Sequence, residues 1–436
     1  MTTGHSVIRA AAIAASIATG SLVSMASPAW AAPVSNPIAP ASGPGQAPYE
    51  DGVKAMAQGN LELAQKSFER SLSLEPKRVQ SILALAEIAR LRDNDAAAEK
   101  YLIQARQLAP ADPTVNGAWA KWLNSQRRFD EARIALEEAV ALTPDAAPLW
   151  TDLGVLYARA LNNKPKAIEA FREALKRDPK LAGAHFALGT LMAETGARAQ
   201  AEGEFEAAAK LEPKDPRPYE AIGKLHADAG EFGQALTAYE KALAADPKYV
   251  SARIAVGDVH LHTKNFDQAA AAFTAAVEIN PLADGAWLRL GLLEQERGRL
   301  DLAEQAYRKA IKVNPTQAFA LNNLAAMLNA RAGSQDEALA FAQRAVDVAG
   351  NAVFLDTLAQ IHRSRGELQK AAEALKLAAA RAPNDAPVHY RLGVVLEDLK
   401  ENAAAVAAYK RALAINGRFA DADAARKRLA AIDKTN

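Results

Sequence analysis

Apolar residues along most of the chain recur three and four positions apart, and polar residues fill the positions between them. In "KAIEAFREALKRDP" this spacing joins Ala167, Phe171 and Ala174, and Pro179 follows. Residues three and four apart lie on one face of an α-helix, so the pattern predicts a helix that buries its apolar face. The segment "LWTDLGVLYARA", just before it, predicts a partner helix of the same kind.

The same helix pair recurs with a period of about 34 residues. Proline follows the second helix at Pro76, Pro110, Pro144, Pro179, Pro213, Pro247, Pro281, Pro315 and, after a double interval, Pro383. Alanine marks the second helices at Ala64, Ala98, Ala132, Ala167, Ala201, Ala235, Ala269, Ala303, Ala338, Ala371 and Ala405. Gly or Ala marks the first helices at Gly52, Ala86, Ala120, Gly154, Gly189, Gly223, Gly257, Gly291, Ala325, Ala359 and Gly393. Such a period predicts stacked helix pairs that bury their faces against their neighbours.

Glycine, proline and one polar pair indicate where the helices begin and end. A glycine between the two helices of a repeat tolerates the left-handed backbone that ends the first helix. These glycines are Gly59, Gly196, Gly230, Gly298 and Gly366. The prolines end the second helices. In the ninth repeat, Ser334 and Glu337 have the spacing of a capping box for the second helix.

These positions resemble the tetratricopeptide repeat family. In one repeat the family's positions hold Trp150, Leu153, Gly154, Tyr157, Ala167, Phe171, Ala174 and Pro179. The resemblance implies an all-α fold, a right-handed superhelical solenoid of about eleven helix-turn-helix repeats over residues 47–417. Residues 418–436 predict a polar helix that caps the stack, which a solenoid needs for solubility. The pattern departs locally at Pro48 in the first repeat, and at Gly350 and Gly417, which replace the proline of the ninth and eleventh repeats.

The first 46 residues lack the repeat and predict export. Arg9 precedes an apolar run of small residues, and Ala29-Trp30-Ala31 supplies an A-x-A site. We therefore expect a signal peptide over residues 1–31, cleavage after Ala31 and a periplasmic location. Residues 32–46, rich in Pro and Gly, predict a flexible linker.

Two further features bear on attachment to a membrane. The apolar run near the N-terminus is too short and too rich in alanine for a comfortable transmembrane start. No other stretch approaches about 20 apolar residues, so no transmembrane anchor is expected. The chain contains no Cys, which excludes disulfides and the lipid anchor of a lipoprotein.

Charge and motifs argue against a nucleic-acid binder and an enzyme. The 52 Lys and Arg balance 51 Asp and Glu, whereas nucleic-acid binding needs a basic stripe that displaces counterions. The chain lacks G-x-x-x-x-G-K-[ST], H-E-x-x-H and G-x-S-x-G. We therefore predict no catalytic residue and no cofactor.

The histidines predict packing roles. His260 and His262 are two residues apart, which points them in different directions on a helix, so a shared metal is not expected. Three histidines occupy the place of Tyr157, and two occupy the place of Trp150. They are His226, His260 and His362, and His185 and His389, respectively.

The angular positions on the first helices predict a groove. We number each repeat so that Gly154 and its counterparts take place 8. Places 5, 9 and 12 then cluster within about 60°, away from the packing stripe of Trp150, Gly154 and Tyr157. In the family, the first helices line a concave surface that binds extended peptides or partner proteins. The predicted groove residues are Phe186, Glu220, Lys224, Ile254, Asp258, Leu261, Leu288, Leu292, Asn322, Asn329, Asp356, Gln360 and Arg363, with Glu87, Arg90, Lys121 and Asn124 in earlier repeats.

An apolar groove beside amides and charges suits an extended peptide, whose side chains need pockets and whose backbone needs donors and acceptors. The alternative interpretation is that the apolar residues pack on the adjacent helix and the polar ones are solvated. No run of three repeats carries the Lys and Asn pattern of the family's carboxylate clamp for chaperone tails, so that activity is not implied.

A second resemblance concerns the biological process. "ALNNLAAMLNA", "VFLDTLAQIHRSRGELQKAAEALKLAA" and "PVHYRLGVVL" look like the C-terminal part of large exported repeat proteins in exosortase/PEP-CTERM exopolysaccharide loci. Those proteins are often lipoproteins, and this chain lacks the lipid-accepting Cys. The prediction is an exported, non-enzymatic interaction scaffold in envelope or exopolysaccharide biogenesis. The alternatives are an accessory subunit of a glycosyltransferase and direct glycan binding, which Trp119 and Trp122 would favour if they were exposed.

Overall fold

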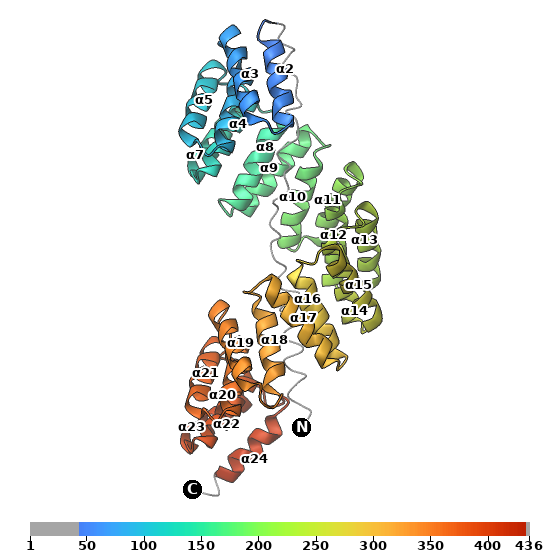
Figure 1. Cartoon of the computed structure of the whole chain (residues 1–436), viewed down its shortest axis with the longest axis vertical. Helices are drawn as coiled ribbons and strands as arrows, with labels where there is room; N and C mark the ends of the chain where they lie inside the picture. The colour runs from blue at the N-terminus through green and yellow to red at the C-terminus, as the bar shows by residue number, and fades with distance from the viewer. Residues whose placement is uncertain (1–42, 433–436) are drawn as a thin grey trace. The chain divides into compact units, whose positions relative to one another are not determined.

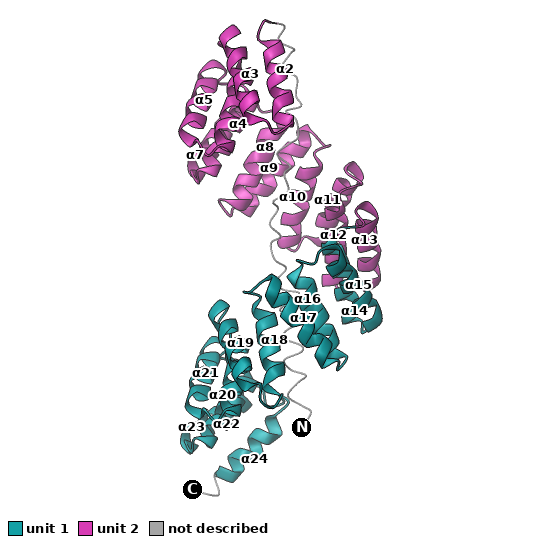
Figure 2. Cartoon of the chain, in the orientation of Figure 1, with its two compact units in different colours: residues 1–26, 248–436 teal, residues 27–247 magenta. Residues whose placement is uncertain are grey.

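The computed structural model describes residues 43–432, and every regular element in that range is an α-helix (Figure 1). The predicted signal peptide, residues 1–31, and most of the predicted linker lie outside the described residues. Of the described chain, residues 43–247 belong to one compact unit and residues 248–432 to another (Figure 2). We call them the N-terminal unit and the C-terminal unit.

The N-terminal unit contains repeats one to six, each a pair of antiparallel-packed helices. Its helices are α2 (Gln46–Ala57), α3 (Leu61–Leu74), α4 (Val79–Leu91), α5 (Asp95–Leu108), α6 (Pro113–Ser125), α7 (Phe129–Leu142), α8 (Ala147–Arg159), α9 (Lys164–Arg177), α10 (Ala182–Glu194), α11 (Arg198–Leu211), α12 (Pro216–Asp228) and α13 (Phe232–Ala245). Within this unit, each helix packs on its partner in the repeat, and each second helix packs on the first helix of the next repeat.

The C-terminal unit contains repeats seven to eleven and a final helix. Its helices are α14 (Val250–His262), α15 (Phe266–Ile279), α16 (Asp284–Glu296), α17 (Leu300–Val313), α18 (Ala318–Asn329), α19 (Gln335–Val348), α20 (Ala352–Ser364), α21 (Leu368–Arg381), α22 (Ala386–Asp398), α23 (Asn402–Ile415) and α24 (Ala422–Ile432). Its packing follows the same order. The predicted all-α solenoid class is confirmed.

The residue at place 8 of the first helix is matched to a residue of the second helix. Glycine at place 8 occurs with a ring, in Gly52/Phe68, Gly154/Phe171, Gly189/Phe205, Gly223/Tyr239, Gly257/Phe273, Gly291/Tyr307 and Gly393/Tyr409. Alanine occurs with Leu or Ala, in Ala86/Leu102, Ala120/Leu136, Ala325/Ala342 and Ala359/Leu375. A Cβ added to Gly257 would lie 2.4 Å from the Phe273 ring. The ring therefore occupies the space of the missing Cβ, and the two positions specify each other.

The turn between the two helices of a repeat takes a left-handed residue. The five glycines predicted there have φ between +73° and +80°, which confirms the prediction. In the ninth repeat Gly333 takes the same conformation, with φ of +78°, and in the five other repeats the turn holds a residue with a side chain at φ between +47° and +66°: Asp93, Arg127, Asn162, Lys264 or Lys400. For such residues the left-handed conformation costs about 1–2 kcal/mol. The turn therefore keeps its backbone conformation even where the residue there disfavours it.

Asparagines cap several second helices, whereas the predicted capping box is wrong. The Oδ1 atoms of Asn60, Asn94 and Asn163 accept backbone N–H groups at 3.1–3.2 Å. Ser334 is the N-cap residue of α19, but its side chain makes no capping hydrogen bond. Glu337 instead forms an ion pair with Arg308 at 2.8 Å. Its carboxylate is held by a guanidinium of the preceding repeat and does not close the box.

In several repeats the residue at place 4 hydrogen-bonds to the carbonyl of the proline that separates repeats. Trp150 Nε1 donates to the carbonyl of Pro144 at 2.8 Å, and Trp287 Nε1 donates to that of Pro281 at 2.9 Å. In other repeats the same contact comes from a ring nitrogen of His185 at 3.1 Å or His389 at 3.2 Å, each to the proline six residues earlier. These two histidines have the structural role that their place predicts.

The last helix covers the end of the C-terminal unit. Phe419, Ala422, Ala425 and Ile432 are buried against the eleventh repeat, while Asp423, Arg426 and Lys427 are exposed. An apolar inner side and a charged outer side are what a capping helix requires. In the described chain, no helix has the length and apolar character needed to cross a membrane.

Candidate functional site

The candidate groove is the face of the first helices that carries places 5, 9 and 12. In the N-terminal unit, Phe186 of α10 and Glu220 of α12 are partly buried there, and Lys224 of α12 is exposed. The guanidinium of Arg217 lies 5.4 Å from the centre of the Phe186 ring, a cation–π contact. Lys224 Nζ lies 3.5 Å from the carboxylate of Asp228.

In the C-terminal unit, the apolar part of the predicted groove is largely packed. Ile254 and Leu261 of α14 contact the apolar cluster around Phe273, and Leu292 of α16 contacts the cluster of the eighth to tenth repeats. All three remain partly exposed. They therefore fit the interpretation that they pack on adjacent helices, and only their outer edges face the groove.

Three predicted groove residues are buried, so the prediction that they face a partner is wrong. Leu288, Asn322 and Asp356 are 4%, 2% and 3% exposed. All three occupy place 5 on α16, α18 and α20, which pack side by side. A helical angle gives the direction of a side chain but not the distance to the next helix, which covers place 5 on these three helices. Asn329 of α18 is partly exposed, and its Oδ1 has no hydrogen-bond partner among the described residues.

Ion pairs join the first helices of consecutive repeats across place 6. In each pair, a charged residue at place 6 meets the opposite charge at place 5 or 9 of the preceding repeat. We call such a pair a rung. The rungs are Lys121–Asp152 at 3.2 Å, Asp258–Arg289 at 2.6 Å, and Asp356–Arg391. In most other repeats place 6 is alanine. In the three repeats of the rungs, place 6 carries a charge and the preceding repeat carries the opposite charge.

Burial raises the pKa of the Asp152, Asp258 and Asp356 carboxyls, and the neighbouring Lys or Arg acts in the opposite direction. At Asp356 the amide of Gln360 also donates to the carboxylate, at 2.9 Å. Asp258 and Asp356 are thus engaged within the fold. Their carboxylates bind the first helix of the next repeat, so they are already paired within the chain and are not free to bind a partner protein.

The rung at Asp356 borders a hollow on the groove face of the C-terminal unit. The hollow has a volume of about 220 Å³ and lies among α20, α21, α22 and α24. We call it the arginine pocket, and its walls include Gln360, Arg363, Tyr390, Arg391, Val394 and Arg428. The structure therefore brings two predicted residues, Gln360 and Arg363, to one concave site. Arg363 is exposed and its Nε donates to Asp398 at 2.8 Å.

The sequence reasoning missed the other walls of the arginine pocket. Tyr390 and Val394 occupy places 5 and 9 of the eleventh repeat, so the same angular rule identifies them once it is extended by one repeat. Arg391 at place 6 is indicated by its charge at a place that is usually alanine. Arg428 lies on the cap helix α24, where no repeat register exists and no signal could have found it.

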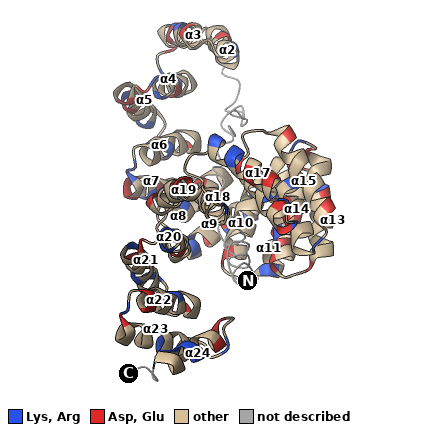
Figure 3. Cartoon of the chain, turned by 60° about the horizontal axis from the view of Figure 1, so that its bottom comes forward, with Lys and Arg blue, Asp and Glu red and all other residues tan. Residues whose placement is uncertain are grey.

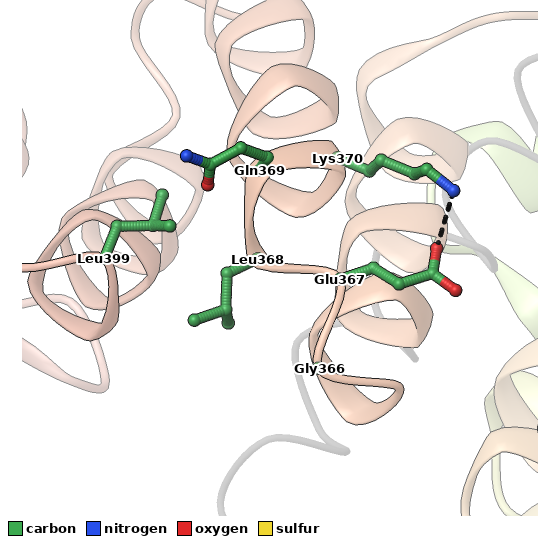
Figure 4. Close-up of a pocket in the computed structure, with 6 residues that line it drawn as sticks. All are labelled: Gly366, Glu367, Leu368, Gln369, Lys370 and Leu399. Atoms are coloured by element: carbon green, nitrogen blue, oxygen red, sulfur yellow. Dashed lines mark hydrogen bonds and ion pairs between the residues drawn. The ribbon is translucent and has the colours of Figure 1, made fainter.

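A second hollow, of about 450 Å³, lies at the turns of the tenth and eleventh repeats (Figure 4). Leu368 and Leu399 form its apolar part, and Gln369 lies beside them. Its two charged lining residues pair with each other, Lys370 Nζ lying 3.1 Å from Glu367 (Figure 4). No polar groups converge on an enclosed space in this second hollow. We therefore interpret it as an irregularity of the surface and not as a binding site.

Two buried histidines tie the first helix of a repeat to the turn that follows. His226 Nδ1 lies 2.6 Å from Glu231, and its Nε2 lies 3.1 Å from Glu202. His362 Nδ1 lies 2.8 Å from Glu367, which stands five residues later, as Glu231 does after His226. Both histidines are therefore packing residues. Among residues 43–432, no group of three His, Asp or Glu could hold a metal ion.

The two tryptophans considered for sugar stacking are buried. Trp119 and Trp122 of α6 stack on each other with ring centres 5.1 Å apart. Arg106 covers the Trp119 ring and Arg128 covers the Trp122 ring, at 5.1 and 5.4 Å. The condition under which they favoured glycan binding is therefore not met. Lys and Arg are interspersed with Asp and Glu over each unit, and α24 carries both signs (Figure 3).

Comparisons with known proteins agree with this architecture. A family model described as the cilia and flagella-associated protein 70 C-terminal domain, a TPR model, matches residues 166–430, more than half of the chain. A tetratricopeptide repeat model matches residues 49–113 and 123–182.

Individual proteins are similar over various lengths. The chain is 26% identical over 172 residues to the cellulose synthase 2 operon protein C of Komagataeibacter xylinus, a match of 35% of this chain but 13% of that protein. The crystal structure of the APC/C hetero-tetramer Cut9-Hcn1 matches with a TM-score of 0.48 and 15% identity, covering 88% of this chain and 96% of that one. The yeast Tom70 structure matches with a TM-score of 0.46 and 15% identity, covering 90% and 96%.

Proposed function

The chain belongs to the tetratricopeptide repeat family, and we propose that it is an exported scaffold that binds partner proteins through extended segments laid on its groove face. The fold supports interaction with proteins, since repeats of this family form binding surfaces and are typically non-catalytic. The observation that carries the proposal is the arginine pocket. It is a concave site on the predicted groove face, and two predicted groove residues line it.

Export to the periplasm and a role in envelope or exopolysaccharide biogenesis are parts of the same proposal. The apolar N-terminal run with its A-x-A site supports export. The similarity to a cellulose synthase operon protein supports exopolysaccharide biogenesis, although the match spans a small part of that protein. A reporter fused after residue 46 tests export. We expect a periplasmic signal, and a reporter that stays in the cytoplasm contradicts it.

Affinity capture from envelope extract tests groove binding. Leu292→Glu places a charge on the groove face at a partly exposed position. Leu302→Glu makes the same change on the second helix of the same repeat, at an exposed position. We expect partners captured by the wild type to be lost with Leu292→Glu and kept with Leu302→Glu. Recovery of the same proteins by all three forms would refute groove binding. Leu288 is unsuitable for this test because it is buried.

A role beside a glycan-synthesising enzyme is the second candidate, favoured by the name of the cellulose synthase operon relative. In this case the captured partner would be a glycosyltransferase subunit, and synthesis by that enzyme would change when this chain is removed. Direct glycan binding has less support because Trp119 and Trp122 are buried. Titration of the chain with the exopolysaccharide, followed by light scattering, tests direct glycan binding. Binding of the polysaccharide is expected for that role and for neither of the protein-binding roles.

A further inference from the structure

The arginine pocket collects three cations on a wall that contains no acidic residue. Arg363 comes from α20, Arg391 from α22 and Arg428 from the cap helix α24. Each is held by a carboxylate that stands outside the pocket lining: Asp398 at 2.8 Å, Asp356, and Glu397 at 2.9 Å, respectively. The carboxylates thus orient the guanidiniums from the side, and the surface turned to the hollow is cationic.

The hydrogen bonds of these arginines leave donors for a ligand. Arg363 and Arg391 both bond their carboxylates through Nε. Within the described chain, this leaves the terminal nitrogens of both guanidiniums without a hydrogen-bond partner. A guanidinium presents five N–H donors in a fixed plane that matches a carboxylate. The amide of Gln360, at the same wall, already donates to Asp356 and offers its carbonyl oxygen instead.

The size and the apolar wall of the pocket limit what it can hold. Its volume of about 220 Å³ is below the roughly 300–1,000 Å³ of sites that enclose a whole small molecule. It suits one side chain or one chain end of a longer segment. Tyr390 and Val394 give this segment an apolar contact beside the cations. Because each of the three arginines already has one carboxylate partner, the charges of the cluster cancel, which favours a singly charged group over a phosphate.

We propose that the arginine pocket binds a carboxylate of an extended partner segment, and that the cap helix contributes to this site through Arg428. The proposal rests on the proposed function, because it names the chemistry that the groove recognises. It gives α24 a second role beside covering the end of the stack. The carboxylate comes from a Glu or Asp side chain or from a chain terminus, which share the same chemistry.

The test uses an array of random octapeptides, printed with free or amidated C-termini, and the full chain as the probe protein. We expect bound peptides to be enriched in Glu, Asp or a free terminus at one position, and replacement of that group by Gln or an amide to lower affinity at least ten-fold. Enrichment of Glu or Asp identifies a side chain as the source, and dependence on the free end identifies the terminus.

Variants on the cap helix separate the site from general charge. Arg428→Gln should lower the affinity for the selected peptide about ten-fold, and Arg363→Gln should do the same. Lys427→Gln removes one charge from the neighbouring, exposed position of α24 and should leave affinity unchanged. Thermal melts of each variant check that the cap remains folded. If Arg428→Gln melts early, Arg363→Gln on α20 carries the test.

The outcomes distinguish the two proposals. If the wild type binds no peptide on the array, the proposed groove function fails. If it binds peptides without preference for carboxylates, or if Arg428→Gln, Arg363→Gln and Lys427→Gln bind alike, only the arginine pocket proposal is overturned. Preference for phosphoserine over Glu at the selected position, or binding of a polyuronate in place of peptides, also overturns it.

Discussion

The rung between the third and fourth repeats and the rung between the tenth and eleventh repeats both use place 6, but with opposite polarity and with partners at place 9 and place 5, respectively. In the N-terminal unit, place 6 carries Asp152, and the preceding repeat supplies Lys121. In the C-terminal unit, place 6 carries Arg391, and the preceding repeat supplies Asp356. The fold accepts either order because only the pairing of charges is required. The C-terminal order, however, puts a guanidinium at the wall of a hollow.

The two rungs also differ in burial. The Lys121 and Asp152 side chains are 46% and 23% exposed, whereas Asp356 is almost completely buried. Coulomb attraction between exposed charges is weak in water, and an unpaired buried charge is costly. The N-terminal rung is therefore expected to be dispensable, and the C-terminal rung to hold its repeats together.

The largest effect is expected when the buried rung is broken. Asp356→Ala leaves Arg391 with no carboxylate, and removal of one partner of a buried pair costs about 3–5 kcal/mol. We expect a loss of about 2–3 kcal/mol, because Arg391 keeps partial access to solvent. Lys121→Ala should cost less than about 1 kcal/mol. Urea unfolding followed by circular dichroism measures both.

A double-mutant cycle with Arg391→Ala isolates the pair itself. If Asp356→Ala and Lys121→Ala lower the unfolding free energy equally, burial does not distinguish the two rungs and the comparison is wrong.

A smaller loss is expected from the contact between helices of one repeat, and it should occur in both units. Gly393→Ala places a Cβ 2.6 Å from the Tyr409 ring, and Gly154→Ala places one 2.9 Å from the Phe171 ring. Overpacking of this kind costs about 1–3 kcal/mol, with the greater loss at Gly393. Thermal melts measure it. Adding Phe171→Leu to Gly154→Ala reproduces the Ala120/Leu136 pair and should recover part of the loss. A double variant no better than Gly154→Ala argues against the matched pairs.

A gain of stability is expected at turns that hold a left-handed residue with a side chain. Arg127 in the N-terminal unit and Lys400 in the C-terminal unit have φ of +58° and +66°. Glycine removes the cost of that conformation but adds entropy to the unfolded chain, so each substitution by Gly should stabilise by about 0.5–1 kcal/mol. The reverse change, Gly366→Lys, should destabilise by a similar amount. A lower melting temperature for Lys400→Gly would show that the side chain contributes more than the backbone costs.

The sequence predicts the repeat architecture well because small and large residues must alternate wherever two helices touch. Gly154 and Phe171 show this directly, since one occupies the space that the other leaves free. The histidines follow the same logic. His185 stands at the place of Trp150, and its ring nitrogen makes the same contact with a proline carbonyl.

The groove was predicted less well because its residues depend on distances between helices. Asp356 has the right angle for the groove, but the neighbouring first helix buries it. Ser334 has the right spacing for a cap, but Glu337 is drawn to Arg308. Arg428 lies outside the repeat, so neither period nor place could identify it. Local pattern fixes the helix pairs, whereas the site depends on contacts between repeats.

The smallest expected effect concerns pH, and here the two units should agree. The guanidinium of Arg198, with His226, lowers the pKa of Glu231 to about 2. Arg365, with Lys370 and His362, lowers the pKa of Glu367 to about 2. A carboxyl whose pKa is lowered by folding stabilises the fold above its unfolded pKa of about 4.3 and loses that contribution as the pH falls toward 2. Glu231→Gln and Glu367→Gln should therefore each make stability depend less on pH between about 4.3 and 2.

Asp356 supplies the opposite sign within the C-terminal unit. Burial raises its pKa, so the folded state binds a proton more tightly than the unfolded chain. Its contribution is most favourable below about pH 3.9 and declines as the pH rises through the folded pKa. Asp356→Asn should therefore make stability rise more steeply with pH just above 3.9, whereas Glu367→Gln makes the rise below 4.3 shallower. Melting temperatures at half-unit steps from pH 3 to 6 compare the two variants with the wild type. Changes of the same sign in both variants would mean that Arg391, rather than burial, governs the ionisation of Asp356, and the two rungs would then differ in polarity alone.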